Sequence, residues 1–339
     1  MTRRELLAFA GSSIALSQTV DAPVKPHVLE SGDTVGLITP STFVSDPDAL
    51  ATAERTVRYF GLKPKWGNNV RRKFGYTGGS VEERLDDLHA MFADPDVKGV
   101  FPIRGGYGSG QLLDRIDYDL IRKNPKIFVG YSDITAMHLA IQRKTGLVTF
   151  HGPVPLSGFT DYTIEHFRKA LFEKQPLGTL TNPPETNELR PKHTLRTIRG
   201  GKARGRLTGG NLSLILATMG TPFEIETRGR ILFLEDVDEQ PYSIDRMLTN
   251  LRLAGKLQAA AGIVFGECSD CAPRDYKPSF NSTLLLGEVL DEILGGLKAP
   301  VLSGLTFGHT PDQLTLPEGV MATLDADRGE LIIEETAVQ

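Results

Sequence analysis

The chain has 339 residues, of which 40% are hydrophobic and 24% charged, and it carries a formal net charge of -4. These proportions exclude wholesale disorder, collagen and coiled coil. The charges are nearly balanced and no run of Lys or Arg occurs, so the sequence shows no basic patch for binding nucleic acid. No stretch of about 18 apolar residues occurs, which excludes a multi-span membrane protein, and two cysteines cannot form a disulfide scaffold. The length predicts a soluble α/β protein of two domains.

The N-terminal residues have the form of a twin-arginine export signal. Arg3-Arg4 precedes a weak apolar stretch over residues 6–16, and Val20-Asp21-Ala22 offers an imperfect cleavage site. Residues 1–26 are therefore predicted to be an export signal or a disordered tail, and the mature protein to be periplasmic. The alternative is an amphipathic or frayed helix at the start of a cytoplasmic protein.

The first domain, predicted over residues 27–160, alternates short apolar runs with helical patterns. Strands are expected at 34–39, 99–103 and 126–130, and helices at 48–60, 81–92, 111–116 and 133–144. Such alternation predicts a mainly parallel, doubly wound sheet. In sheets of this kind a ligand lies beyond the carboxyl ends of the strands.

Residues 161–204 read as a connector, because four prolines and scattered charges leave little periodicity there. The second domain is predicted over residues 205–339. Its expected elements are a glycine-rich turn at 209–211, helices at 212–219, 243–254 and 283–294, strands at 230–234 and 262–265, and antiparallel strands at 320–324 and 330–334.

Ser132 is the first candidate for chemistry. It follows a buried strand and directly precedes a helix, so a sharp turn would lift its hydroxyl out of the sheet and aim backbone N–H groups above it. The string Gly130-Tyr131-Ser132-Asp133 does not match the G-x-S-x-G motif. The alternative is that Ser132 only caps the helix that follows.

A glycine-rich turn, Arg104-Gly105-Gly106-Tyr107-Gly108-Ser109-Gly110, follows the preceding strand. It does not fit a dinucleotide loop, because the third glycine of the G-x-G-x-x-G motif would have to stand where Gln111 is. Free amides in such a turn can bind an anion, including a developing oxyanion. The alternative is a tight connection without a chemical role.

Two further polar residues complete a possible nucleophilic set. Glu235 ends the predicted strand at 230–234, and His309 lies in a loop between apolar segments. A serine nucleophile needs a base, and a histidine base needs a carboxylate to fix its tautomer. By itself His309 is more typical of an ordinary hydrogen-bonded loop histidine than of a catalytic base.

Cys268-x-x-Cys271 lacks the second ligand pair of a structural zinc site and the helix start of a thioredoxin motif. Both cysteines are therefore interpreted as structural. No H-E-x-x-H, P-loop or EF-hand string occurs in the sequence.

Together these segments resemble the LD-carboxypeptidase family of serine peptidases, which includes murein tetrapeptide carboxypeptidases and microcin C self-immunity peptidases. The resemblance covers residues 32–331. It rests on strings distributed along the chain: Ile103-Arg104-Gly105-Gly106-Tyr107-Gly108, Val129-Gly130-Tyr131-Ser132-Asp133, Phe150-His151-Gly152-Pro153, Gly209-Gly210-Asn211-Leu212, Leu234-Glu235-Asp236, Pro241-Tyr242, Asp245-Arg246 and Gly308-His309-Thr310.

The resemblance implies that Ser132 is the nucleophile, His309 the general base and Glu235 its orienting carboxylate, with the backbone amides of Gly106 and Asp133 forming an oxyanion hole. It also implies a flavodoxin-like N-terminal domain, a smaller C-terminal α/β domain, an active site at their interface and a homodimer. Substrate contacts are predicted for Arg104 and Asn211, which lie within the matching strings.

The implied activity is hydrolysis of an L,D-peptide bond that releases the terminal D-alanine of a murein tetrapeptide in cell-wall recycling, without metal or organic cofactor. One alternative is a peptidase for microcin C-type peptide-nucleotides. A second alternative, from another functional class, is a non-catalytic periplasmic protein that binds muropeptides.

Overall fold

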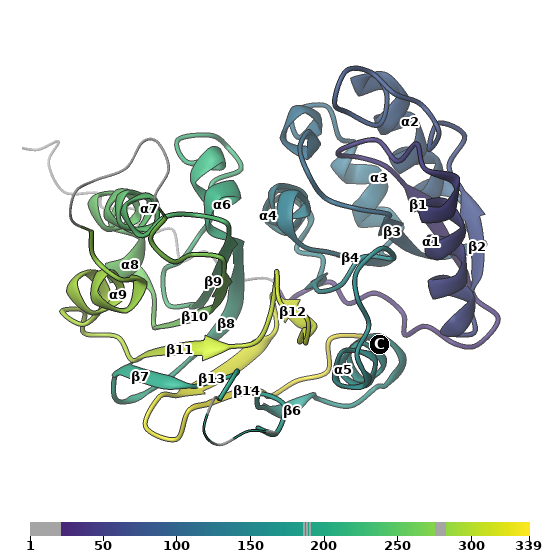
Figure 1. Cartoon of the computed structure of the whole chain (residues 1–339). Coiled ribbons are helices and arrows are strands. Elements are labelled where there is room, and N and C mark those ends of the chain that lie inside the picture. Colours follow the sequence, from purple (N-terminus) through teal and green to yellow (C-terminus); the bar gives the residue numbers. More distant parts are fainter. Residues whose placement is uncertain (1–21, 186, 188, 190, 275–282) are drawn as a thin grey trace, which may run out of the picture.

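Two sheets, each in its own lobe, organise the chain (Figure 1). The computed structural model describes residues 22–185, 187, 189, 191–274 and 283–339. Most of the predicted export signal lies outside these residues. Within them, no helix combines the length and the apolar character needed to cross a membrane.

The first sheet has the strand order β12-β5-β4-β3-β1-β2. Its strands are β1 (Thr34–Ile38), β2 (Lys63–Trp66), β3 (Val97–Pro102), β4 (Ile127–Gly130), β5 (Thr149–His151) and β12 (Leu316–Glu318). The first five are parallel, and β12 pairs antiparallel with β5. The order 2-1-3-4-5 is that of flavodoxin-like folds, so the predicted doubly wound N-terminal domain is confirmed.

Helices cover both faces of this sheet. They are α1 (Pro47–Tyr59), α2 (Val81–Ala93), α3 (Tyr118–Lys123), α4 (Thr135–Thr145) and α5 (Asp161–Phe172). Because side chains alternate along a strand, Phe101 of β3 packs in one core with α1 and α5, whereas Val100 packs with α2, α3 and α4. The start of α2 is fixed by a capping box between Ser80 and Glu83.

The second sheet has the order β6-β14-β13-β8-β9-β10-β11-β7. Its strands are β6 (Gly178–Leu180), β7 (Arg196–Arg199), β8 (Lys202–Asn211), β9 (Ile231–Val237), β10 (Gly262–Ser269), β11 (Val301–Leu305), β13 (Met321–Asp325) and β14 (Glu330–Ile333). Strands β8 to β11 are parallel, and the flanking strands are antiparallel. Helices α6 (Leu212–Thr218), α7 (Pro241–Leu253), α8 (Lys256–Ala259) and α9 (Leu286–Leu294) pack on one face.

One apolar core joins the two lobes. It includes Phe150 of the first sheet, Phe233 of the second, and Phe307 from the loop after β11, all fully buried. Strand β12 strengthens this union, because it comes from the C-terminal part of the chain yet pairs with β5 of the first sheet. An extensive apolar interface fixes the orientation of two domains, so residues on the two sheets keep their mutual positions.

The predicted connector over 161–204 differs from what the structure shows. It contains helix α5, strands β6 and β7 and the first residues of β8. Helix α5 begins at the cap Thr160 and buries Phe167, Ala170 and Leu171 along one stripe. The neighbouring prolines masked this short helical pattern in the sequence. The domain boundaries themselves stay predictions.

Candidate active site

Ser132 lies in a strained turn at the carboxyl end of β4. Its φ of +63° is in the left-handed region that non-glycine residues rarely adopt. The residue opens the 3₁₀ turn η3 (Ser132–Ile134), which leads directly into α4. A Cβ atom on Gly105 would lie only 3.3 Å from the Ser132 hydroxyl oxygen, so glycine favours the close approach of the two segments. Strain of this kind is characteristic of functional turns.

The glycine-rich turn is tied to the serine turn by Asp133. The buried Asp133 carboxylate accepts hydrogen bonds from the Ser41 hydroxyl at 2.6 Å and from the Ser109 backbone N–H at 2.8 Å. Gly106 has a φ of +113°. Neither its N–H nor that of Asp133 is used in a hydrogen bond among the described residues. Two unused amides beside a serine are what an oxyanion hole requires.

Glu235 and His309 form a close pair in the second lobe. His309 Nδ1 lies 2.8 Å from Glu235 Oε2, and the backbone N–H of His309 donates to the same oxygen at 3.3 Å. Glu235 is fully buried on β9, whereas His309 is partly exposed. Burial alone would lower the pKa of His309, but the hydrogen bond to Glu235 and its negative charge outweigh burial and raise it.

The structure brings the segment that carries Ser132 against His309 of the other lobe. Tyr131, which directly precedes Ser132, has its ring 4.8 Å from the His309 ring. Within the described residues no hydrogen bond joins Ser132 to His309. Catalytic hydrogen bonds of this type are often long until substrate binds. Ser132 and Glu235 both stand at the carboxyl ends of parallel strands, and His309 follows such a strand, which is where ligands of these sheets bind.

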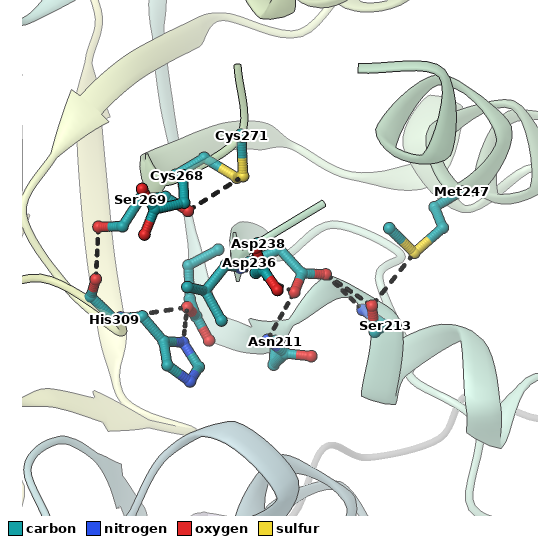
Figure 2. The surroundings of a disulfide bond; sticks show 12 residues. Asn211, Ser213, Asp236, Asp238, Met247, Cys268, Ser269, Cys271 and His309 are labelled. Carbon is teal, nitrogen blue, oxygen red and sulfur yellow. Dashed lines mark hydrogen bonds and ion pairs between the residues drawn. A yellow bond between two sulfur atoms is a disulfide. The ribbon is translucent and has the colours of Figure 1, made fainter. Parts of the chain in front are cut away.

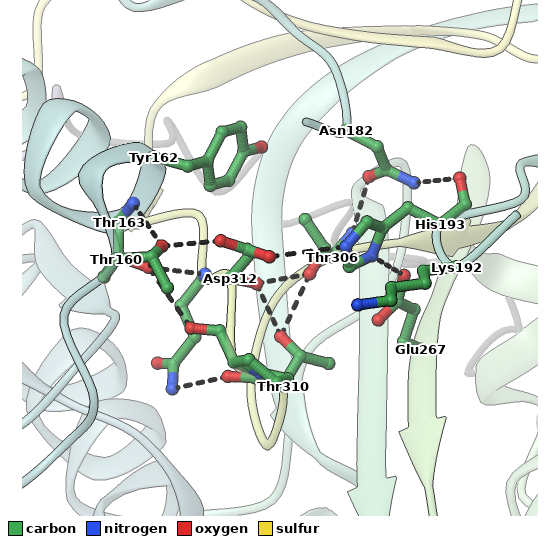
Figure 3. Close-up of polar contacts among 12 residues, drawn as sticks. Thr160, Tyr162, Thr163, Asn182, Lys192, His193, Glu267, Thr306, Thr310 and Asp312 are labelled. Atoms are coloured by element: carbon green, nitrogen blue, oxygen red, sulfur yellow. Dashed lines mark hydrogen bonds and ion pairs between the residues drawn. The ribbon is translucent and has the colours of Figure 1, made fainter. Parts of the chain in front are cut away.

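A polar network that the sequence analysis missed holds the loop bearing His309 (Figure 3). Asp312 accepts from the Thr160 hydroxyl at 2.5 Å and lies 3.3 Å from His193 Nε2. The other nitrogen of His193 contacts Glu267 at 2.6 Å. These residues come from the N-cap of α5, the predicted connector, β10 and the loop itself, and no local pattern links them. They fix the loop in place beside β9.

The two cysteines form a disulfide next to the same loop (Figure 2). Cys268 and Cys271 flank Ser269, whose hydroxyl donates to the backbone carbonyl of His309 at 2.6 Å. The disulfide therefore sits in a segment that supports the proposed base. No group of three or more His, Cys, Asp or Glu side chains in the described ranges is arranged to hold a metal ion.

The two predicted substrate contacts have different surroundings. Asn211 is buried; its amide nitrogen donates to Asp236 at 3.1 Å and its amide oxygen caps α6 through the Leu214 N–H. Arg104 is exposed at the start of the glycine-rich turn. A contact of either residue with substrate stays a prediction.

Comparisons with known proteins bear directly on this site. Family models of the LD-carboxypeptidase N-terminal and C-terminal domains match residues 35–152 and 204–324. The chain belongs to the LD-carboxypeptidase family. It is 43% identical over 310 residues to the Bacillus subtilis protein named "Probable murein peptide carboxypeptidase", covering 91% of this chain and 94% of that protein.

Two further family members are similar to this chain over nearly its whole length. The murein tetrapeptide carboxypeptidase of Pseudomonas aeruginosa is 30% identical over 303 residues, covering 87% of this chain and 94% of that one. The solved structure of microcin C7 self-immunity protein superposes with a TM-score of 0.83 at 32% identity, covering 94% of this chain and all of the other. Membership in this peptidase family supports a hydrolytic enzyme.

Proposed function

We propose that this LD-carboxypeptidase family member is a serine-type enzyme that hydrolyses the L,D-peptide bond before the terminal D-alanine of a murein tetrapeptide. The serine-type proposal is supported by the strained turn of Ser132, whose neighbour Tyr131 packs against His309 of the Glu235–His309 pair. The peptide class is supported by relatives named for murein peptides.

In the proposed mechanism each ring nitrogen of His309 has its own task. Because Nδ1 is hydrogen-bonded to Glu235, the proton of neutral His309 is held there and Nε2 is left as the base. Nε2 takes the Ser132 proton as the hydroxyl oxygen attacks the scissile carbonyl. The protonated ring then donates to the leaving amine of D-alanine, and a water molecule repeats the sequence on the acyl-enzyme.

The developing negative charge on the carbonyl oxygen needs donors in fixed positions. The unused N–H groups of Gly106 and Asp133 flank the serine and supply them. Each such donor contributes about 10²–10³ in kcat in comparable sites. Asp133, through its bonds to Ser41 and Ser109, keeps the two amides in register.

The alternative substrate is a peptide-nucleotide of the microcin C type, which the likeness to the self-immunity protein favours. An adenine is commonly bound by stacking on an aromatic ring. The single tryptophan, Trp66, stands on the edge strand β2, three strands away from β4. Nucleotide stacking on tryptophan therefore has no support at this site, and the murein tetrapeptide is preferred.

Mass spectrometry of purified protein incubated separately with a murein tetrapeptide, its pentapeptide counterpart and an aminoacyl sulfamoyl adenosine tests the substrate class. Loss of one D-alanine from the tetrapeptide alone is expected. Cleavage of the nucleotide only would establish the alternative. Absence of turnover on all three, together with no labelling of Ser132 by a fluorophosphonate, would instead favour a binding protein.

Mutants of the three residues test the mechanism. Ser132→Ala and His309→Ala should each lower kcat by about 10⁴–10⁶, and the double variant should lose little more because the residues act as one unit. Glu235→Gln should cost somewhat less, since it removes only the charge that fixes the tautomer of His309. Substantial D-alanine release by well-folded Ser132→Ala would overturn the serine mechanism.

A further inference from the structure

A buried histidine lies directly behind the Glu235–His309 pair. His151 ends strand β5, is fully buried, and its Nε2 lies 3.9 Å from Glu235 Oε1. That oxygen is the one not used by His309, which bonds to Oε2. Among the described residues, neither ring nitrogen of His151 nor Oε1 of Glu235 has a hydrogen-bond partner. Two unsatisfied polar groups therefore face each other inside the protein.

The aromatic surroundings of His151 all belong to the active site. Its ring is 6.3 Å from Tyr131, 5.2 Å from Phe233 and 6.3 Å from Phe307. These residues lie one or two positions before Ser132, Glu235 and His309 respectively. The position of the His151 ring is thus set by the same three segments that carry the proposed triad.

The titratable groups around His151 are Glu235, His309, Tyr131 and His138 of α4. Burial, with a smaller effect of the His309 charge, lowers the pKa of His151 to about 3. The ring is therefore neutral near pH 7 and carries a single N–H that can act as a donor.

The 3.9 Å separation from Glu235 is longer than a hydrogen bond. It is also too short for a bridging water, because two bonds of ~2.8 Å meeting at a tetrahedral angle span ~4.6 Å. A buried carboxylate oxygen without a donor is unfavourable. A small rotation of Glu235 toward His151 would satisfy both groups at once.

Resting on the proposed function, we infer that His151 is a positioning residue: its Nε2–H supports Oε1 of Glu235, so that Oε2 stays directed at His309 Nδ1. The support acts when His309 takes up the serine proton, because the carboxylate must then hold its orientation against a full positive charge. His151 does not touch the reacting atoms.

The test compares His151→Phe with His151→Gln and the wild type. Phenylalanine keeps a ring but removes the N–H, whereas the glutamine amide nitrogen can take the place of Nε2. We expect His151→Phe to lower kcat about 10–100-fold with KM nearly unchanged. The acid limb of kcat/KM should shift to lower pH, because a misdirected Glu235 raises the pKa of His309 less. His151→Gln should recover most of both effects.

The labelling rate of Ser132 by a fluorophosphonate, measured alongside the thermal midpoint, separates this inference from the substrate assignment. Slower labelling of folded His151→Phe would support the positioning role even where the tetrapeptide is not cleaved. Equal labelling rates and pH profiles for the wild type and His151→Phe would overturn it. No labelling of wild-type Ser132 would refute both the triad and the role of His151.

A second inference comes from a cavity of about 430 Å³ between the lobes, away from the triad. It is bordered by α4, by β8 and by the loop that leads into β9. Its charged lining consists of Arg143, Lys144, Arg206, Glu224, Glu226 and Arg230. Arg230 directly precedes β9, so the cavity opens near the amino end of that strand, five residues before Glu235 and roughly 15 Å from it.

Positive charge at this cavity is only partly balanced. Glu224 pairs with Lys256 at 2.9 Å, and Arg206 pairs with Glu335 at 3.3 Å and donates to the Gly319 carbonyl at 2.8 Å. The side chains of Arg143 and Arg230 make no hydrogen bond or ion pair within the described residues. Burial lowers the pKa of Arg230. The charge of Glu226 opposes this shift, and the charges of Arg206 and Arg143 add to it. Two neighbouring guanidinium groups that lack a direct ion pair can bind oxyanions.

We propose that this cavity binds a small polyanion carrying two or more phosphate or carboxylate groups, held by Arg143 and Arg230. The site is independent of the proposed peptidase activity. Its planar guanidinium groups suit bidentate contacts to either kind of oxyanion.

Calorimetry and thermal unfolding with pyrophosphate, citrate and sodium chloride at equal ionic strength test this proposal. A Kd near 1 mM for at least one polyanion, and a Tm increase of about 2 °C at ~10 mM, are expected. Arg230→Gln should abolish both effects. Arg252→Gln, on an exposed position of α7, is the matched control and should keep them. Stabilisation no greater than that by chloride, or unchanged in Arg230→Gln, would refute the site.

Discussion

Replacing Gly308 by alanine should disable the site through a single added methyl group. Gly308 directly precedes His309 and has a φ of +83°, and a Cβ atom there would lie 2.3 Å from Glu235 Oε2. An ordinary contact is about 3.4 Å, so the carboxylate must move by about 1 Å. Such a shift would lengthen the 2.8 Å bond to His309 Nδ1 beyond hydrogen-bonding distance.

Two effects of this substitution can be separated. The left-handed backbone costs about 1–2 kcal/mol for any residue with a Cβ atom. Misorientation of the base should lower kcat by about 10²–10⁴, as for other disturbances of a histidine–carboxylate pair. Gly255→Ala is the matched control, since Gly255 has a φ of +73° but no atom within 4 Å of an added Cβ. It should lose stability alone.

The assay measures D-alanine release, the labelling rate of Ser132 and the thermal midpoint for both variants. We expect similar decreases in Tm of a few degrees, and a loss of kcat and labelling only in Gly308→Ala. A folded Gly308→Ala enzyme within twofold of wild-type kcat would refute the collision argument. An equal loss of activity in Gly255→Ala would show that backbone strain, rather than the contact with Glu235, is responsible.

Three other predictions follow from charge and space in the structure. Burial raises the pKa of Glu318 to about 8, so the contribution of Glu318 to the free energy of unfolding falls as pH rises from about 4.5 to 8. The stability of Glu318→Gln relative to the wild type, measured by urea titration, should therefore rise by up to about 4 kcal/mol over that interval. Gly106→Val should lower kcat at least about 10²-fold, because a Cβ atom would lie 2.3 Å from Thr42 Oγ1 and displace an oxyanion donor; unchanged kcat in a folded variant would reduce Gly106 to a turn residue. If Arg3-Arg4 directs export, cell fractionation should find the wild type in the periplasm and an Arg3→Lys/Arg4→Lys variant in the cytoplasm, and equal retention of both would contradict the signal.

The amino-acid sequence determined the elements that depend on local periodicity. Alternating apolar runs located β1, β3, β4, β9 and β10, and helical spacing located α1, α2, α4 and α7, each within a few residues of the observed bounds. The glycine-rich turn at 104–110 was also readable, because glycine favours tight turns, whereas the turn predicted at 209–211 is the carboxyl end of β8. The same local logic singled out Ser132.

Only the tertiary structure decided which distant residues meet. Glu235 and His309 are 74 residues apart, and their contact depends on how β9 and the loop after β11 are packed. The placement of β12 beside β5, the network around Asp312, and the burial of His151 against Glu235 have no periodic signature either. Hydrophobic patterns specify which face of an element is buried, but not which other element covers it, because apolar contacts are non-directional. The candidate site lies where those unspecified contacts are made.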